Sequence, residues 1–234
     1  KGYVALMAPE VINEGVITAT LSGKNAVALV SGEQVTIQIQ DRQMLSVSVD
    51  ASAIKSLIQN KRLIQVEGGQ VLLAANAAKD LKNSVIQNTG VISATGITSN
   101  GGKISLRAST VTQSGTVAAN SAAATGGEVT ITGNQVTLES GSVTSATGAS
   151  GGGQILVGTT AAKPDSTTSL AKTVHVKSNA LVDASATQSG HGGTVAIWSS
   201  QTTTVAGVLQ AKGGAVSGNG GRIETSSSGQ VIYG

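Results

Sequence analysis

The sequence contains no cysteine and no phenylalanine, and its 234 residues include only two prolines, one tryptophan and two tyrosines. The absence of cysteine excludes disulfide bonds and thiolate metal sites. Because aromatic side chains are so few, the 39% of residues that are hydrophobic must form a core mainly from Val, Ile, Leu and Ala. No run of about 18 apolar residues is present, so the sequence offers no candidate transmembrane helix. This composition favours a thin core of stacked aliphatic side chains.

Charged residues are also scarce, at 12% of the chain with a formal net charge of +3. The 15 Lys and Arg residues are scattered, and Lys61 and Arg62 form the one adjacent basic pair. Proteins that bind along phosphate backbones gather basic residues on one face. We therefore expect no nucleic acid among the partners of this protein.

Glycine, in contrast, is abundant, with 31 residues that follow no collagen-like period. Paired glycines recur along the chain, and their second members are Gly69, Gly102, Gly127, Gly153, Gly193 and Gly221. These positions are separated by 33, 25, 26, 40 and 28 residues. A degenerate period in the twenties is typical of a solenoid, in which each repeat forms one coil.

Apolar residues occupy every second position after each glycine pair, which is the pattern of a short strand with one face turned inward. The pairs are Val71 and Leu73, Ile104 and Leu106, Val129 and Ile131, Ile155 and Val157, and Val195 and Ile197. Strands of successive repeats must pair in parallel because the chain winds on in one sense. The sequence thus predicts an all-β fold, a right-handed parallel β-helix of about eight coils. A β-sandwich is the alternative, but the sequence does not indicate the hairpin turns that it would need.

A second motif reads as strand, tight corner, strand. Its corner residues are Gly15, Gly90, Gly115, Gly141, Asn179 and Gly207. Because glycine and asparagine tolerate positive φ, we expect a left-handed backbone at these structural corner residues. Arg62 takes the equivalent place in another repeat, where the corner must relax or be strained.

Three segments interrupt the rhythm. Helical spacing of Ala, Ile and Leu predicts short helices at about 51–58 and 75–84. The Thr- and Ser-rich segment at about 158–172 contains Pro164 and predicts a loop excursion. The expected organisation is β-helix coils over 1–50, a coil with the two helices over 51–84, and regular coils over 85–234.

Several stretches, taken in their order along the chain, resemble one family. They are KGYVALMAPEVINEGVITA (1–19), GKNAVALVSGEQVTI (23–37), LIQNKRLIQVEGGQVLLAANAAKDL (57–81), GGTVAIWSSQTTTVAGVLQAKGG (192–214) and GNGGRIETSS (218–227). The chain resembles the exoproteins of bacterial two-partner secretion, the filamentous-haemagglutinin-like adhesins. In that family the part like residues 1–50 lies late in, or just after, the amino-terminal secretion domain, and a long right-handed β-helical stalk follows. The family usually has Gly where Arg62 stands.

This resemblance implies export through an outer-membrane transporter partner, a secreted or cell-surface location in a Gram-negative bacterium, and roles such as adhesion, biofilm formation, haem capture or toxin delivery. We expect a structural stalk segment of a surface-displayed adhesin, with a host-cell, neighbouring-cell or glycan receptor that the sequence does not identify. The alternative is a carbohydrate-binding or carbohydrate-active β-helix with a site on one lateral face.

Candidate residues for chemistry are few. His175 alternates with Val174 and Val176 and should face solvent, and His191 lies in a glycine-rich turn. Neither has the surroundings of a catalytic base, so we expect no enzyme. The Asp residues are too dispersed for a metal site, and we expect no metal and no cofactor. Trp198 should face outward as a candidate ligand contact that could stack on a sugar ring, or else pack under the 158–172 excursion or a neighbouring coil.

The two ends of the chain read like the interior of the pattern. KGYVALMA at the amino end is already a core-type strand, and GGRIETSSSGQVIYG at the carboxyl end should place Ile223 inward and begin another inward strand at Val231. Neither end of the sequence contains a polar cap that would cover the edges of the terminal strands. We expect flanking coils of a longer chain in both directions, and end-to-end self-association of the isolated segment.

Overall fold

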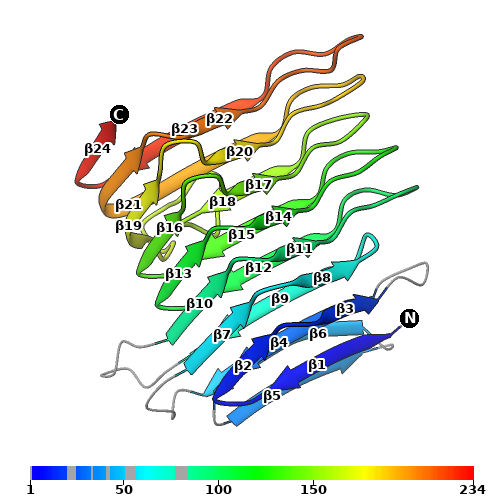
Figure 1. The fold of residues 1–234 in the computed structure, drawn as a ribbon. Coiled ribbons are helices and arrows are strands. Elements are labelled where there is room, and N and C mark those ends of the chain that lie inside the picture. Colours follow the sequence, from blue (N-terminus) through cyan, green and yellow to red (C-terminus); the bar gives the residue numbers. More distant parts are fainter. Residues whose placement is uncertain (1, 20–24, 33, 41–42, 51–55, 77–83) are drawn as a thin grey trace.

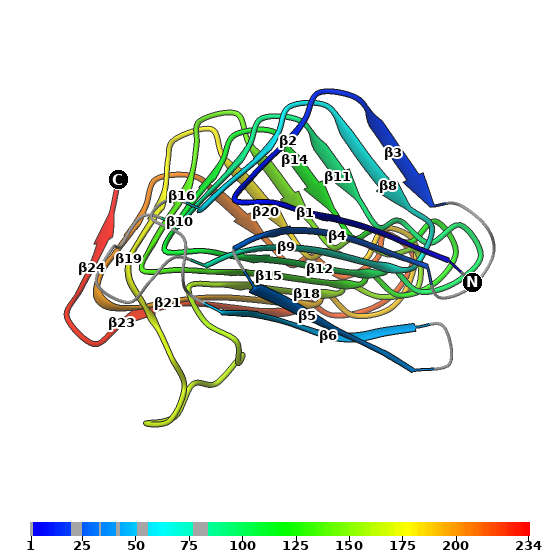
Figure 2. The same cartoon turned by 90° about the horizontal axis from the view of Figure 1, so that it is seen from below.

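The structure is a computed structural model that describes residues 2–19, 25–32, 34–40, 43–50, 56–76 and 84–234. The chain winds into a solenoid of stacked coils (Figure 1), and the view along the stack shows three faces (Figure 2). Strands of neighbouring coils pair in parallel on every face. The predicted parallel β-helix is therefore confirmed.

The first face begins each coil. Its strands are β1 (Tyr3–Met7), β4 (Ala26–Ser31), β9 (Gln70–Ala75), β12 (Lys103–Arg107), β15 (Glu128–Thr132), β18 (Gln154–Val157), the first half of β21 (Thr194–Val205) and β23 (Arg222–Ser227).

The second face follows after a corner. It contains β2 (Glu10–Asn13), β7 (Ser56–Asn60), β10 (Ser84–Asn88), β13 (Thr110–Gln113), β16 (Gln135–Leu138), β19 (Ala171–Val176), the second half of β21 and β24 (Gln230–Tyr233). Strand β21 runs through this corner without a break, so it joins the first and second faces into one hydrogen-bonded sheet.

The third face closes each coil as a separate seven-stranded sheet. It contains β3 (Val16–Ala19), β8 (Leu63–Val66), β11 (Val91–Ser93), β14 (Thr116–Ala118), β17 (Val143–Ser145), β20 (Leu181–Asp183) and β22 (Val208–Gln210).

The core consists of aliphatic ladders that run along the stack. Ile104, for example, pairs in register with Val71 on one side and Val129 on the other, and all three are buried. Every apolar pair that alternation predicted to face inward, from Val71 to Ile197, is at most 1% exposed. Each such side chain stabilises the fold by about 1.5–3 kcal/mol relative to an exposed one. A coil alone could not bury these residues, and the stack does.

One part of the predicted organisation is wrong. Residues 34–40 and 43–50 do not continue the coils but form two antiparallel strands, β5 (Gln34–Gln40) and β6 (Gln43–Asp50), here called the hairpin. The hairpin lies outside the first face (Figure 2), and β6 contacts β4. Ala28 and Val30 of β4, which point away from the core, are fully buried. The hairpin therefore explains why β4 carries hydrophobic residues on both of its sides: one side faces the core and the other faces the hairpin.

The predicted helices are also not found where the structure can be compared. Residues 56–58 belong to β7, Ala75 ends β9 and Ser84 begins β10, so none of them is helical. The remainder of each predicted helix, residues 51–55 and 77–83, lies outside the described residues. Ser56 and Ile58 pair in register with Ser84 and Ile86, because burial in the ladders outweighs local helical spacing.

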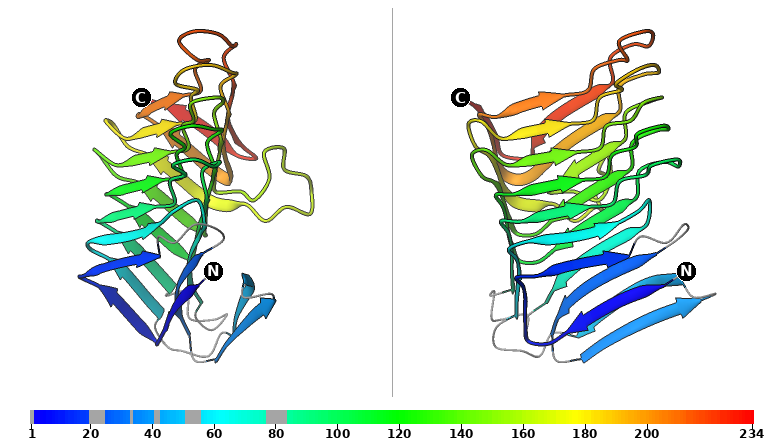
Figure 3. Two further views of the ribbon diagram at one scale, coloured as in Figure 1. Left: turned by 90° about the vertical axis from the view of Figure 1, so that its right-hand side faces the viewer. Right: turned by 45° about the vertical axis from the view of Figure 1, so that its right-hand side comes forward.

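The predicted excursion is present. Strand β18 ends at Val157 and β19 begins at Ala171, and the intervening segment projects from the outer side of the solenoid (Figure 3). The chain leaves the coil through Gly158, whose φ is 74°. Leu156 and Ala196 beside this point are buried although they lie outside the core ladders. The 40-residue interval in the glycine period thus reflects one inserted loop.

Candidate functional site

The paired glycines stack on one another at the corner between the third and first faces. A Cβ atom on Gly127 would lie 2.0 Å from the carbonyl oxygen of Gly102, and one on Gly153 would lie 2.2 Å from that of Gly127. Neither distance allows a side chain. The same close approach recurs from Gly69 to Gly221. The glycine period is therefore a consequence of how closely the coils pass at this corner.

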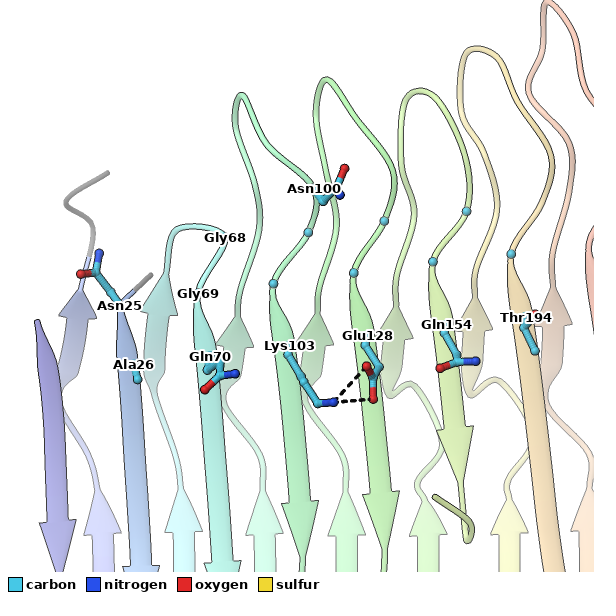
Figure 4. A pocket seen from close by; sticks show the side chains of 17 residues that line it. Asn25, Ala26, Gly68, Gly69, Gln70, Asn100, Lys103, Glu128, Gln154 and Thr194 are labelled. Carbon is cyan, nitrogen blue, oxygen red and sulfur yellow. Dashed lines mark hydrogen bonds and ion pairs between the residues drawn. The ribbon is translucent and has the colours of Figure 1, made fainter. Parts of the chain in front are cut away.

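The stacked glycines from Gly69 to Gly193 form the floor of a groove of about 840 Å³ that runs across successive coils (Figure 4). The groove crosses residues from Asn25 to Thr194. A column of outward side chains from the starts of the first-face strands lines it, namely Gln70, Lys103, Glu128, Gln154 and Thr194. Because the groove spans several successive coils, it is our candidate functional site.

Electrostatically the groove is nearly neutral. The Lys103 Nζ atom lies 2.9 Å from Glu128 Oε1, so the two charges that line it neutralise each other (Figure 4). Such a half-exposed pair stabilises a fold by no more than about 1 kcal/mol. The floor offers few free hydrogen-bonding groups, because the Gly102 and Gly127 amides donate to Ala94 and Ala119, and the Gly102 carbonyl accepts from Glu128. Amide side chains, above all those of Gln70, Asn100 and Gln154, are what the groove presents to a ligand.

A ladder of buried amide side chains lies at the corner between the second and third faces, and it was not predicted from the sequence. Asn13 Nδ2 donates to Asn60 Oδ1 at 2.8 Å, Asn60 Nδ2 to Asn88 Oδ1 at 2.7 Å, and Asn88 Nδ2 to Gln113 Oε1 at 2.6 Å. All four side chains are at most 6% exposed. The signal was an amide residue at the same place in VINEG, LIQNKR, VIQNTG and VTQSG. Buried amides satisfied by one another favour one register of the coils.

The corner residues fall into two groups. Gly141 and Asn179 have positive φ, 78° and 62°, as expected. Gly15, Gly90, Gly115 and Gly207 do not, so the prediction of a left-handed backbone is wrong for these four.

At most of these four positions, close contact with the preceding coil explains why the residue is glycine. A Cβ atom on Gly115 would lie 2.0 Å from the carbonyl oxygen of Gly90, whereas Gly15 has no neighbour closer than 4.0 Å. Arg62 also lacks positive φ, and no left-handed strain arises at its corner.

The residues considered for chemistry do not come together. His175 is exposed on β19, as expected, and His191 is exposed with its Nδ1 accepting a hydrogen bond from the Asn219 amide at 3.0 Å. Trp198 is half-buried, and its indole nitrogen is covered and has no hydrogen-bond partner among the described residues. The indole thus does not present a hydrogen-bonding edge to a ligand. Within the described ranges, no three His, Asp or Glu side chains gather in a way that could hold a metal ion.

The excursion carries a carboxylate held by hydroxyl groups. Asp165 Oδ1 accepts hydrogen bonds from the Thr167 hydroxyl at 2.7 Å and the Thr168 hydroxyl at 2.9 Å, and from the amides of both residues. The Thr167 hydroxyl, followed by that of Thr168, lowers the pKa of Asp165 below its ordinary value. These bonds shape the loop.

In the part of the chain that the structure describes, no helix is long and apolar enough to cross a membrane.

The chain is similar to known proteins, although no family model matches it. The heme/hemopexin-binding protein of Haemophilus influenzae is 32% identical over 108 residues, which are 46% of this chain and 11% of that protein. The crystal structure of the HMW1 secretion domain from Haemophilus influenzae matches 99% of this chain and 59% of that one, with a TM-score of 0.81 and 25% identity. The resemblance to two-partner secretion exoproteins that the sequence predicted is confirmed.

Proposed function

Because the chain is similar in fold and sequence to the secretion domain of a two-partner secretion exoprotein, we propose that it is an exported segment of such an exoprotein. It leaves a Gram-negative cell through an outer-membrane transporter partner and is secreted or displayed at the surface. The structural likeness over 99% of the chain carries this proposal.

The connectivity of the coils supports export. Each coil contacts only its neighbours, so coils can form one at a time as the chain emerges from a pore. The absence of cysteine means that no disulfide can close the chain before it passes. A fold built from local additions suits a protein that crosses a membrane extended and folds outside.

The finer role is that of a non-enzymatic stalk segment of an adhesin that serves adhesion or biofilm formation. Support comes from what the groove lacks. Its lining residues include no aromatic side chain, and their one carboxylate, Glu128, is paired with Lys103. A carbohydrate-active site would need paired carboxylates, and carbohydrate binding favours aromatic platforms. We therefore favour the stalk over the lateral carbohydrate site.

Self-association between segments is part of the proposal. The first coil exposes Tyr3, Met7 and Val16, and the last exposes Ile223 and Tyr233. Ile223 pairs in register with the buried Val195, so it occupies a core row although it is 45% exposed. Rows of this kind, with open strand edges, can add a further coil from another chain.

Export is tested in the native bacterium with the transporter gene intact or deleted. The chain, preceded by a signal peptide and followed by a reporter enzyme, should reach the medium only when the transporter is present. A reporter with the signal peptide but without the chain is the control and should stay in the periplasm in both strains. Equal release from the two strains, or retention in both, would contradict the proposal.

A further inference from the structure

The sequence contains two Asn–Gly dipeptides, Asn100–Gly101 and Asn219–Gly220. Each immediately precedes the second glycine of a stacked pair, so the two occupy corresponding places on different coils. Both asparagines are exposed. An asparagine followed by glycine can lose its side-chain amide when the next main-chain nitrogen attacks it, since glycine hinders the attack least. The attack needs a main-chain N–H that is free to lose its proton.

The two dipeptides differ in that N–H group. The Gly101 amide donates a hydrogen bond to the Thr125 carbonyl at 2.9 Å. Its α-carbon is also tightly packed, because an added Cβ would lie 2.1 Å from the Ala119 carbonyl oxygen. The Gly220 amide has no hydrogen-bond partner among the described residues. Gly220 is exposed, and the nearest atom to an added Cβ is the Ala211 carbonyl oxygen at 3.7 Å.

We propose that Asn219 is a site of spontaneous deamidation, whereas the fold protects Asn100. The deprotonated Gly220 nitrogen attacks Cγ of Asn219 and a bond forms between them. The bond from Cγ to Nδ2 breaks, and ammonia leaves with the proton that Gly220 gave up to solvent. Water then opens the resulting succinimide at either carbonyl, which yields an aspartyl or an isoaspartyl residue.

The isoaspartyl product changes contacts between coils. In the unmodified chain the Asn219 amide donates to His191 Nδ1 at 3.0 Å, and the Asn219 carbonyl accepts from the Gly192 amide at 2.9 Å. Isomerisation adds a methylene to the main chain and turns that carbonyl into part of a free carboxylate. The hydrogen bond from Gly192 cannot keep its geometry, so the loop before β23 loses an attachment to the preceding coil.

The test compares the two dipeptides in the same folded chain. The purified protein is incubated at neutral and alkaline pH in water labelled with heavy oxygen, digested, and analysed by peptide mass spectrometry. We expect acid to form at least about tenfold faster at Asn219 than at Asn100, since one hydrogen bond must open at Asn100. The rate at Asn219 should rise with pH. In denaturant the two rates should become similar.

A matched variant separates chemistry from folding. Gly220→Ala has room for its methyl group and no positive φ, so the fold should persist while deamidation at Asn219 slows and Asn100 is unaffected. Equal rates at the two sites in the folded chain, faster reaction at Asn100, or an Asn219 that converts only in denaturant would each overturn the proposal.

Discussion

Replacing Asn60 by alanine tests whether the buried amide ladder stabilises the stack. Asn60 is fully buried, accepts a hydrogen bond from Asn13 and donates one to Asn88. The alanine variant leaves Asn88 Oδ1 without its donor and Asn13 Nδ2 with only a 3.3 Å contact to the Leu63 carbonyl. An unsatisfied buried polar group costs about 1–3 kcal/mol. With two groups affected, we expect the free energy of unfolding to fall by about 2–4 kcal/mol.

The adjacent residue supplies the control. Gln59 lies on the same strand and donates to Gln87 Oε1 at 2.7 Å, but this amide pair is exposed to solvent. Water replaces that bond in Gln59→Ala, so its free energy of unfolding should change by less than about 0.5 kcal/mol. Urea unfolding followed by circular dichroism measures both variants. Equal effects of the two substitutions would refute the reasoning that burial makes the ladder important.

Further predictions concern the glycine ladder, an unpaired hydroxyl and the excursion. Gly127→Ala should lower the free energy of unfolding by about 1–3 kcal/mol because its Cβ meets the Gly102 carbonyl, while Gly15→Ala, which has open space, should be neutral or slightly stabilising in the same assay. Thr144 is fully buried between Val117 and Val182, and its hydroxyl has no hydrogen-bond partner among the residues that the structure describes. Thr144→Val should therefore raise the melting temperature and stabilise the fold by about 1–3 kcal/mol, and a loss of stability would contradict this. The depressed pKa of Asp165 means that its hydrogen bonds stabilise the loop above the unfolded pKa and are lost as the pH falls through the folded pKa. Thr167→Val should move the pKa of Asp165 upward in an NMR titration, and an unchanged titration would argue against the hydroxyl as the main cause.

The sequence was sufficient to predict the core residues and the period of the glycine repeat. Alternation at Ile104 and Leu106 follows directly from which side of a strand faces inward, and the glycine pairs mark a corner that every coil must pass. The hairpin of β5 and β6 was missed because its strands alternate with the same period as the coil strands. Whether such strands pair in parallel or antiparallel depends on partners distant in sequence.

The remaining errors also arise from contacts between coils. Gly115 is needed because the Gly90 carbonyl lies in the way, a reason that its own torsion angles do not reveal. Asn60 and Asn88 stood beside predicted turns, where asparagine is common, so their pairing across coils was not anticipated. The groove depends in the same way on side chains that only the stacking brings into one column.

The stacking of coils in register is the claim on which the ladders, the groove and the likeness to a secretion domain all depend. Thr112 and Thr137 are register partners on adjacent coils, and His175 is the partner of Thr137 on the next coil. Because the chain has no cysteine, a pair of introduced cysteines reports one distance. Register partners in a sheet lie about 4.8 Å apart, within the Cα range of a disulfide, and partners two coils apart lie about 10 Å apart, beyond it. The account predicts that Thr112→Cys with Thr137→Cys forms an intramolecular disulfide on mild oxidation while Thr112→Cys with His175→Cys does not. Efficient disulfide formation in the second pair, or none in the first, would contradict it.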